Sequence, residues 1–301
     1  MRNIVLTILF FCTAFIGNAQ QKEATLNFGN GFLKVIPVAH NAVRIQYYEN
    51  ELNDGGLPDW LYEGRATAVD NCALNVDVNT QQQLLTIKNE SGTPVFTATK
   101  HSMNGTQAQL SFASPKDEYL FGLGQFQDGY SNIRGLARRL TQVNTQISVP
   151  MMLSNKGYGI LWNNYGLVDF NPADNSIALQ ANSNTDSKKD IVDVTSTEGG
   201  KKEVRERNIF EGTLNIAEGG QYSLLLDVGQ KMARRHNLVI DGAPVIEMQN
   251  LWLPPTASAI VTLSAGSHTV SAELSKGDRP TPFLQEDRGR ECLPLSNSSS
   301  C

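Results

Sequence analysis

The sequence predicts an all-β protein made of two successive β-sandwiches. Three observations support this fold class. Apolar and polar residues alternate with a period of two over many short segments, turn-forming dipeptides separate those segments, and no helical period lasts beyond about two turns after the first twenty residues. Many short strands at this spacing are typical of a β-sandwich.

Residues 1–19 have the features of a secretory signal peptide. Arg2 supplies the positive charge, residues 4–16 are mostly apolar, and small residues precede Gln20. We therefore expect cleavage near Ala19 and a secreted or periplasmic bacterial protein. The apolar stretch is shorter than the roughly 20 residues that cross a bilayer, and no later stretch is more apolar, so no membrane span is expected.

The first sandwich is expected over residues 20–205. Its strand at 43–48 shows the alternation well, since Val43 and Ile45 share one face while Arg44 and Gln46 share the other. The Asn-Gly dipeptide at 104–105 is a strong hairpin signal. The strands expected here are residues 32–38, 43–48, 74–78, 84–88, 95–99 and 107–112.

A smaller sandwich is expected over residues 206–276, after two charged stretches at 186–190 and 201–207 that we interpret as solvated connections. The last segment, 277–301, has no strand period and ends in a serine-rich stretch. We expect it to be irregular. An out-of-frame tail is one hypothesis for it, and a naturally disordered terminus is the other.

Charge and cysteine content exclude several classes of function. Removing residues 1–19 deletes one arginine and no acid, so the net charge changes from −5 to −6, and nucleic acid is not an expected partner. No two cysteines have the spacing of metal ligands. We expect neither a metal nor a cofactor.

Three motifs carry a family resemblance: YLFGLGQFQDG at 119–129, LTQVNTQISVP at 140–150, and SNKGYGILWNNY at 154–165. In order and spacing they resemble the galactose-mutarotase-like N-terminal β-sandwich of glycoside hydrolase family 31, which contains α-glucosidases and α-xylosidases. The smaller unit resembles the lectin-type, protective-antigen-like sandwich of some bacterial α-xylosidases, a candidate carbohydrate-binding module. Family members perform their chemistry in a later (β/α)8 barrel, so the resemblance implies a portion truncated before that barrel, which would be its partner in cis.

The resemblance implies the N-terminal part of a secreted glycosidase that hydrolyses α-linked xylose or glucose from oligosaccharides or polysaccharides, xyloglucan-derived ones among them. Such enzymes use two carboxyl groups about 5 Å apart, and in this family both are barrel aspartates. No catalytic residue is therefore assigned here. Whether the chain counts as an enzyme stays open, and alone we expect it to bind or shape substrate without cleaving it.

Four residues are the candidate substrate-binding set. Gln142, Asn144 and Thr145 lie in a loop, 141–146, that resembles the family loop reaching over the barrel mouth. Their amide and hydroxyl groups both donate and accept hydrogen bonds, as sugar hydroxyls require. Trp252 is the candidate sugar platform of the second unit. The structural alternatives are outward polar residues of an edge strand for the loop and a plug beneath a loop for the tryptophan.

The sequence leaves two other functions to consider. A stand-alone extracytoplasmic carbohydrate-binding β-sandwich would bind saccharides through Trp252 or through Trp60, which forms an exposed aromatic pair with Tyr62. A sugar epimerase needs an acid–base pair, such as histidine with glutamate, within reach of the sugar. The sequence shows no matching constellation, which disfavours the epimerase.

Overall fold

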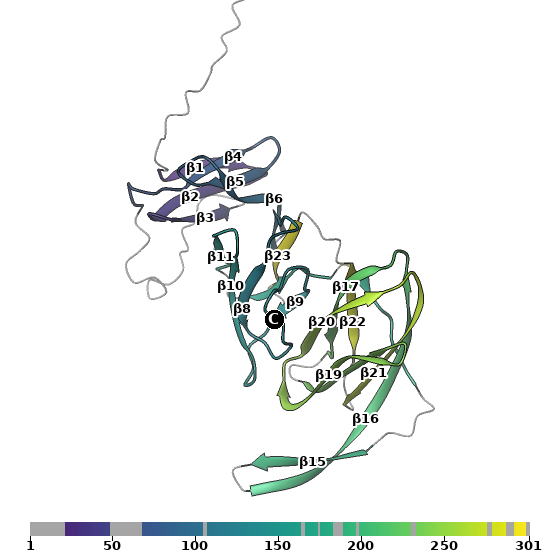
Figure 1. Ribbon diagram of the computed structural model, residues 1–301. Helices are drawn as coiled ribbons and strands as arrows, with labels where there is room; N and C mark the ends of the chain where they lie inside the picture. The colour runs from purple at the N-terminus through teal and green to yellow at the C-terminus, as the bar shows by residue number, and fades with distance from the viewer. Residues whose placement is uncertain are drawn as a thin grey trace, which may run out of the picture. The chain divides into compact units, whose positions relative to one another are not determined.

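Figure 1 shows the chain as a computed structural model, in which residues 22–48, 68–104, 107–163, 166–173, 175–182, 189–196, 199–229, 233–275, 279–286 and 292–298 are described. All regular structure in these residues is β-strand, so the all-β prediction is confirmed. Within the same ranges, a helix able to cross a membrane was not found. The predicted signal peptide lies outside the described residues.

The chain forms two compact units, residues 1–80 with 86–94 and residues 81–85 with 95–301. The first unit contains an antiparallel sheet of order β1-β2-β3. Along β2, Leu33 and Val35 are buried while Phe32 is exposed, as the alternation predicts. The strands of this unit are β1 (Ala24–Phe28), β2 (Gly31–Ala39), β3 (Ala42–Tyr48) and β4 (Asn75–Asn79), followed by β5 (Leu84–Lys88).

The second unit begins with two sheets around one apolar cluster. Strand order is β11-β10-β8 in one sheet and β6-β7-β23-β12-β9 along the other. The strands are β6 (Pro94–Asn104), β7 (Gln107–Ala113), β8 (Leu120–Gln125), β9 (Arg138–Leu140), β10 (Ile147–Ser154), β11 (Gly159–Leu161), β12 (Leu167–Phe170) and β23 (Cys292–Ser298). The buried cluster between them consists of Phe112, Leu120, Leu123, Ile133, Leu136, Leu140, Met152, Val168 and Phe170.

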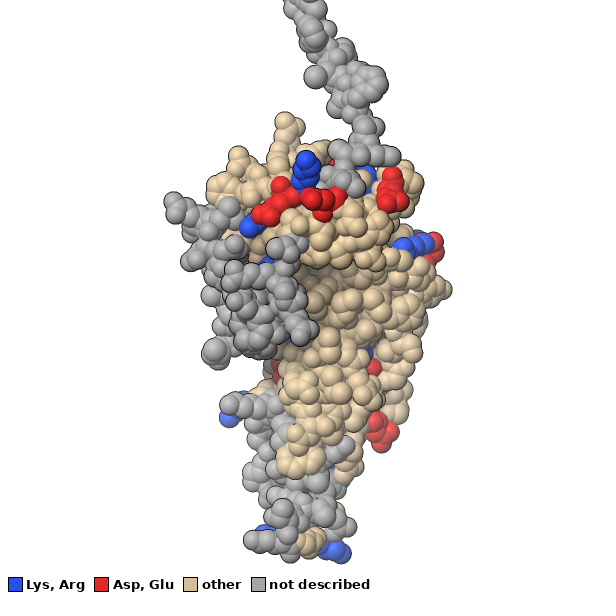
Figure 2. All heavy atoms as spheres, turned by 90° about the vertical axis from the view of Figure 1, so that its left-hand side faces the viewer, with Lys and Arg blue, Asp and Glu red and all other residues tan. Residues whose placement is uncertain are grey.

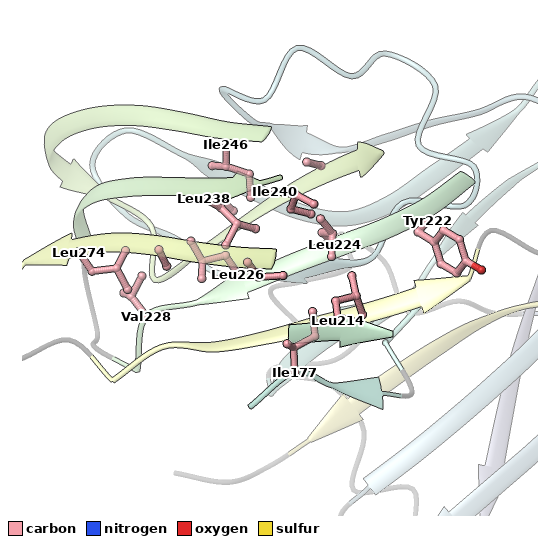
Figure 3. Close-up of a cluster of buried hydrophobic side chains, with 14 of the residues drawn as sticks. Ile177, Leu214, Tyr222, Leu224, Leu226, Val228, Leu238, Ile240, Ile246 and Leu274 are labelled. Carbon is pink, nitrogen blue, oxygen red and sulfur yellow. The ribbon is translucent and has the colours of Figure 1, made fainter. Parts of the chain in front are cut away.

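The rest of the second unit encloses another apolar cluster, drawn in Figure 3. One sheet has the order β13-β22-β17-β20 and the other β14-β16-β21-β18-β19. Leu224 and Leu226 of β17 and Leu238 of β18 are fully buried there. The strands are β13 (Asn175–Ser176), β14 (Gln180–Ala181), β15 (Lys189–Ser196), β16 (Gly199–Ile216), β17 (Gly220–Asp227), β18 (Ala233–Ile240), β19 (Ala243–Leu253), β20 (Thr256–Leu263), β21 (Gly266–Ser275) and β22 (Thr281–Glu286).

Hydrogen bonds join these two clusters at the backbone of Ala137. Its N–H donates to Ser223 Oγ over 2.7 Å, and its carbonyl accepts from Ser258 Oγ over 2.6 Å. Both serines are buried, on β17 and β20 respectively. The segment before the 141–146 loop is therefore fixed to the second cluster as well as the first.

Where solvated connections were expected, the described residues 189–190 and 201–207 of the two charged stretches belong to strands. β15 pairs with the first half of β16, and Figure 1 shows this ribbon extending from the sheet. Oppositely charged residues face each other in the register, Asp190 opposite Arg205 and Asp193 opposite Lys202. The predicted domain boundary after residue 205 falls inside β16, and the domain boundaries stay predictions.

The expected irregular segment, 277–301, also differs from the structure. It contains β22, which pairs with β13 and β17, and β23, which pairs with β7 and β12. Pro282 and Pro294 lie within these strands. Proline cannot donate a backbone hydrogen bond to a neighbouring strand, so it weakens the strand signal in a sequence. β22 and β23 form because they pair with strands distant in the chain, which a local pattern does not reveal.

An apolar surface covers the outward face of the β11-β10-β8 sheet. None of the three strands contains a charged residue, and in Figure 2 the coloured charged side chains lie mainly near the top and the lower part of the view, with tan side chains between them. Phe121 lies opposite Leu153 in the register of β8 and β10. The exposed apolar side chains are Tyr119, Phe121, Ile147, Val149, Leu153 and Leu161. Apolar patches of this kind promote association.

Candidate carbohydrate-binding site

The 141–146 loop contains a tight turn. Val143 and Gln146 exchange backbone hydrogen bonds of 3.3 and 3.2 Å, which places Asn144 and Thr145 at the tip. Asparagine is favoured in turns because its side chain is short and polar. The buried Gln146 side chain donates from Nε2 to the Thr141 carbonyl over 2.8 Å, so the base of the turn is held from inside.

Two of the candidate residues at this turn have different surroundings. Gln142 uses its side-chain carbonyl to accept from the backbone N–H of Ser148 over 3.0 Å, which ties it to the start of β10. Asn144 is exposed, and we find no hydrogen bond of its amide with any described residue. Of these two side chains, the Asn144 amide is the more open to a ligand.

Thr145 connects the turn to the second sandwich. Its hydroxyl donates to the backbone carbonyl of Trp252, at the end of β19. The Thr145 carbonyl accepts from Gln127 Nε2 over 3.1 Å. The turn is thus held from two directions, by the segment after β8 and by the end of β19.

Trp252 is 45% exposed and stands on a buried base. The next residue, Leu253, belongs to the apolar cluster of the second sandwich. His236 is fully buried, and its Nε2 lies 2.8 Å from the Pro254 carbonyl. Burial lowers the pKa of His236 to about 4, so the ring is neutral and Nε2 carries the proton that it donates. This anchoring leaves the tryptophan half exposed and its backbone fixed.

The structure brings Thr145 and Trp252 together, and Asn144 precedes Thr145 at the tip of the turn. Gln142 lies two residues before Asn144 in the chain, and its side-chain carbonyl accepts a hydrogen bond from the backbone of Ser148. The substrate-binding role of all four stays a prediction. Sequence reasoning missed Gln127, whose only local signal was its position in the turn-forming Phe-Gln-Asp-Gly segment after β8.

Other aromatic candidates are placed differently. Trp162 is half-buried against the first apolar cluster, and its backbone N–H donates to the Pro150 carbonyl over 2.8 Å, in agreement with a packing role. Trp60 and Tyr62 lie outside the described residues.

Aspartates near the motifs are held by arginines. Asp128 forms an ion pair with the buried Arg138, whose guanidinium also lies 3.9 Å from the centre of the Phe126 ring. Asp169 is paired with Arg139. Because both carboxylates are used in ion pairs with arginines, they are poorly suited to act as nucleophile and acid at a glycosidic bond. Among the residues with described placement, no group of three or more metal-ligating side chains was found.

No family model matches the sequence. An α-xylosidase from Saccharolobus solfataricus is 28% identical over 170 residues, which cover 47% of this chain and 23% of that protein. α-Xylosidase A from Aspergillus niger is 38% identical over 56 residues, or 19% of this chain and 8% of that protein. The chain thus spans less than a quarter of either relative.

The fold has a solved counterpart. The crystal structure of the family 31 α-xylosidase from Xanthomonas citri superimposes with a TM-score of 0.61 at 17% sequence identity, covering 93% of this chain and 37% of that one. At this identity the likeness concerns the fold. Together with the sequence relatives, it confirms the predicted resemblance to the N-terminal portion of family 31 enzymes.

Proposed function

We propose that this chain is the N-terminal β-sandwich portion of a secreted family 31 glycosidase, whose full-length form releases α-linked xylose or glucose from oligosaccharides. The observation that carries the proposal is the similarity over nearly half of the chain to an α-xylosidase, together with a matching fold over most of it. The relatives' activity itself belongs to proteins several times longer than the matched segments.

The chain's own role in this proposal is to bind and orient saccharide, without cleaving it. A retaining glycosidase needs one carboxylate free to attack and one carboxyl free to protonate. Asp128 and Asp169 instead neutralise arginines. The turn with Asn144, beside the exposed Trp252, offers the amide and aromatic groups that a neutral sugar uses.

Two assays on the purified chain test this proposal. We expect no release of nitrophenol from aryl α-xyloside or aryl α-glucoside, and we expect calorimetric binding of a xyloglucan-derived oligosaccharide. Measurable turnover would refute the non-catalytic role. Absence of a saturable heat signal at two temperatures, up to about millimolar ligand, would refute the binding role, because a dissociation constant of about 1 mM is already a weak affinity, about 4 kcal/mol of binding free energy.

A second candidate is a stand-alone extracytoplasmic carbohydrate-binding protein, which the exposed Trp252 favours. The two candidate functions predict different results when the chain is fused to the catalytic portion of a related enzyme. If the chain is part of a glycosidase, a fusion of residues 20–301 to the catalytic portion of the Xanthomonas citri enzyme should be soluble and hydrolyse aryl α-xyloside. A stand-alone binder should bind saccharide equally well and give an inactive or insoluble fusion.

Secretion is part of the proposal and has its own test. The charge, apolar stretch and small residues at 1–19 support it. Expression with the native N-terminus in a bacterial host should yield periplasmic protein beginning near Gln20, as N-terminal sequencing would show. Cytoplasmic protein that retains residues 1–19 would overturn it.

A further inference from the structure

The ribbon formed by β15 and the first half of β16 presents a pair of apolar residues to solvent. Ile191 lies opposite Val204 in the register, and the two residues are 70% and 60% exposed. Figure 1 shows the ribbon extending from the sheet, and β16 is the only described strand that pairs with β15. Because a two-stranded ribbon is only marginally stable by itself in water, covering this pair would stabilise it.

Charged residues flank the apolar pair on both sides along the same face. Residues two positions apart in a strand share a face, so the neighbouring register positions on this face are those of Lys189 with Glu206 and of Asp193 with Lys202. The basic residue belongs to β15 on one side of the apolar pair and to β16 on the other side. We call the six residues 189, 191, 193, 202, 204 and 206 the ribbon face.

The ribbon face is complementary to a second copy of itself. If two copies stack about a two-fold axis that runs along the ribbon, position 189 lies over Glu206 of the partner subunit and position 193 lies over Lys202 of the partner subunit. If the axis instead crosses the ribbon at the apolar pair, position 189 lies over Asp193 of the partner subunit. Both arrangements match opposite charges at all four charged positions and apolar residues at the centre, as a two-fold symmetric interface requires.

The opposite face of the ribbon lacks this pattern. Val192 lies opposite Glu203, and Val194 lies opposite Lys201, so no two apolar residues are paired across the strands there. An apolar centre surrounded by charges therefore occurs only on the ribbon face among the described positions of this ribbon.

The ribbon also has no net charge. Residues 189–196 and 199–206 together contain four basic and four acidic residues, whereas the whole chain has a net charge of −5. Two copies therefore repel each other little at the ribbon, although the protein as a whole is acidic.

We propose that the ribbon face is a self-association surface through which two copies of this chain form a two-fold symmetric dimer. This inference does not depend on saccharide binding. The eight residues of β15 span about 26 Å, and a ribbon only two strands wide offers less than the roughly 800 Å² per partner of a stable interface. The dimer is therefore weak, with a dissociation constant between about 10 µM and 1 mM.

Sedimentation equilibrium of the full chain, at protein concentrations up to about 1 mM, measures this association. The double variant Ile191→Thr with Val204→Thr keeps a β-branched residue at each position, which preserves the strands, and removes the apolar centre. We expect its dissociation constant to rise at least about tenfold. Val192→Thr with Val194→Thr makes a similar change on the opposite face and should leave association within about twofold of wild type.

Lys201 and Lys202 provide a second comparison, because both are exposed and they lie on opposite faces. Lys202→Glu places a negative charge over an acidic residue of the partner subunit in both arrangements. It should weaken association about fivefold or more at low salt, and less at high salt where charges are screened. Lys201→Glu makes the same charge change outside the ribbon face and should weaken association less than about twofold.

Three results would overturn the proposal. The first is a monomer at every concentration, and the second is an equal loss of association in the ribbon-face variants and their controls. The third is a dimer that persists in Ile191→Thr with Val204→Thr but is lost in Leu153→Lys, which would assign the contact to the apolar surface of the β11-β10-β8 sheet. Neither Ile191 nor Val204 belongs to an apolar cluster of the fold, so the variants should melt at the same temperature as wild type under conditions where all are monomeric.

Discussion

Replacing Arg139 by methionine should destabilise the second unit by removing a charge bridge at its centre. Arg139 donates from Nε and Nη2 to the two carboxylate oxygens of Asp169, over 2.8 and 3.2 Å. Nη1 donates to Asp227 over 2.8 Å. The three residues lie on β9, β12 and β17, so the bridge connects the sheets of both apolar clusters. Methionine keeps much of the aliphatic length and loses every donor.

The expected loss of stability depends on how deeply the three charged side chains are buried. The side chains of Arg139, Asp169 and Asp227 are 26%, 17% and 20% exposed. Breaking a fully buried pair by removing one partner costs about 3–5 kcal/mol, because the remaining charge is left without compensation. Here water reaches part of each carboxylate and offsets some of that cost. We expect the free energy of unfolding to fall by about 2–3 kcal/mol.

Urea unfolding at neutral pH measures this loss, and Lys156→Met provides the control. Lys156 pairs with Asp117 at the surface, where the side chains are 36% and 74% exposed, and such pairs contribute less than about 1 kcal/mol. The double variant Arg139→Met with Asp169→Asn should lose less than the sum of the single changes. If Arg139→Met unfolds at the same urea concentration as Lys156→Met, the bridge does not stabilise the fold as argued.

Three further predictions concern other parts of the fold. The hydrogen bond with Asp241 raises the pKa of His268, and His268 lowers the pKa of Asp241. The pair therefore stabilises most when the histidine is protonated and the aspartate ionised, between about pH 4 and 6.5, and its contribution is lost as pH rises through the folded pKa of the histidine or falls through that of the aspartate. His268→Gln should lower the melting temperature more at about pH 5.5 than at about pH 8.5, and an equal effect at both would contradict this. Leu153→Lys, on the exposed apolar face of β10, should reduce concentration-dependent light scattering of the chain, whereas unchanged scattering would show that the face does not associate. Gly124→Ala should prevent folding or strongly lower the melting temperature, because φ at this residue is +110° and an added Cβ would lie 2.0 Å from a carbonyl oxygen of β10. Gly220→Ala is the control, since an added Cβ there would have open space. An equal effect of the two variants would refute the argument.

Strands that bury one face were predictable from the sequence, and strands without a buried face were not. Leu33 and Val35 of β2 are buried while Phe32 is exposed and Lys34 between them is polar, because one side of this part of the sheet is packed. The first half of β16 lacks this pattern, and Val204 there is 60% exposed. Its strand conformation comes from pairing with β15, which a local pattern of hydrophobicity does not report.

The candidate site shows the same division. Sugar binding at the 141–146 loop was predicted from its resemblance to a family loop together with its amides and hydroxyls, and that role stays a prediction. The contact between Thr145 and Trp252 depends on how two sandwiches pack, and neither residue's neighbours in the chain encode it. The different roles of Asn144, exposed, and Gln142, tied to Ser148, likewise emerge only from the three-dimensional arrangement.

The 141–146 turn rests on a segment, residues 137–139, that is held by buried polar contacts, and this rigidity favours a binding role. Asp128 and Asp169, in contrast, are paired with arginines and are poorly suited to cleave a glycosidic bond. The backbone of Ala137 is clamped by Ser223 and Ser258, and Arg139 is held from two strands, all within a few residues of Thr141, where the loop begins. Binding groups carried by rigid elements lose little conformational freedom when a ligand arrives. The buried polar contacts at 137–139 thus have a consequence beyond stability, because they set the position from which the Asn144 turn reaches Trp252.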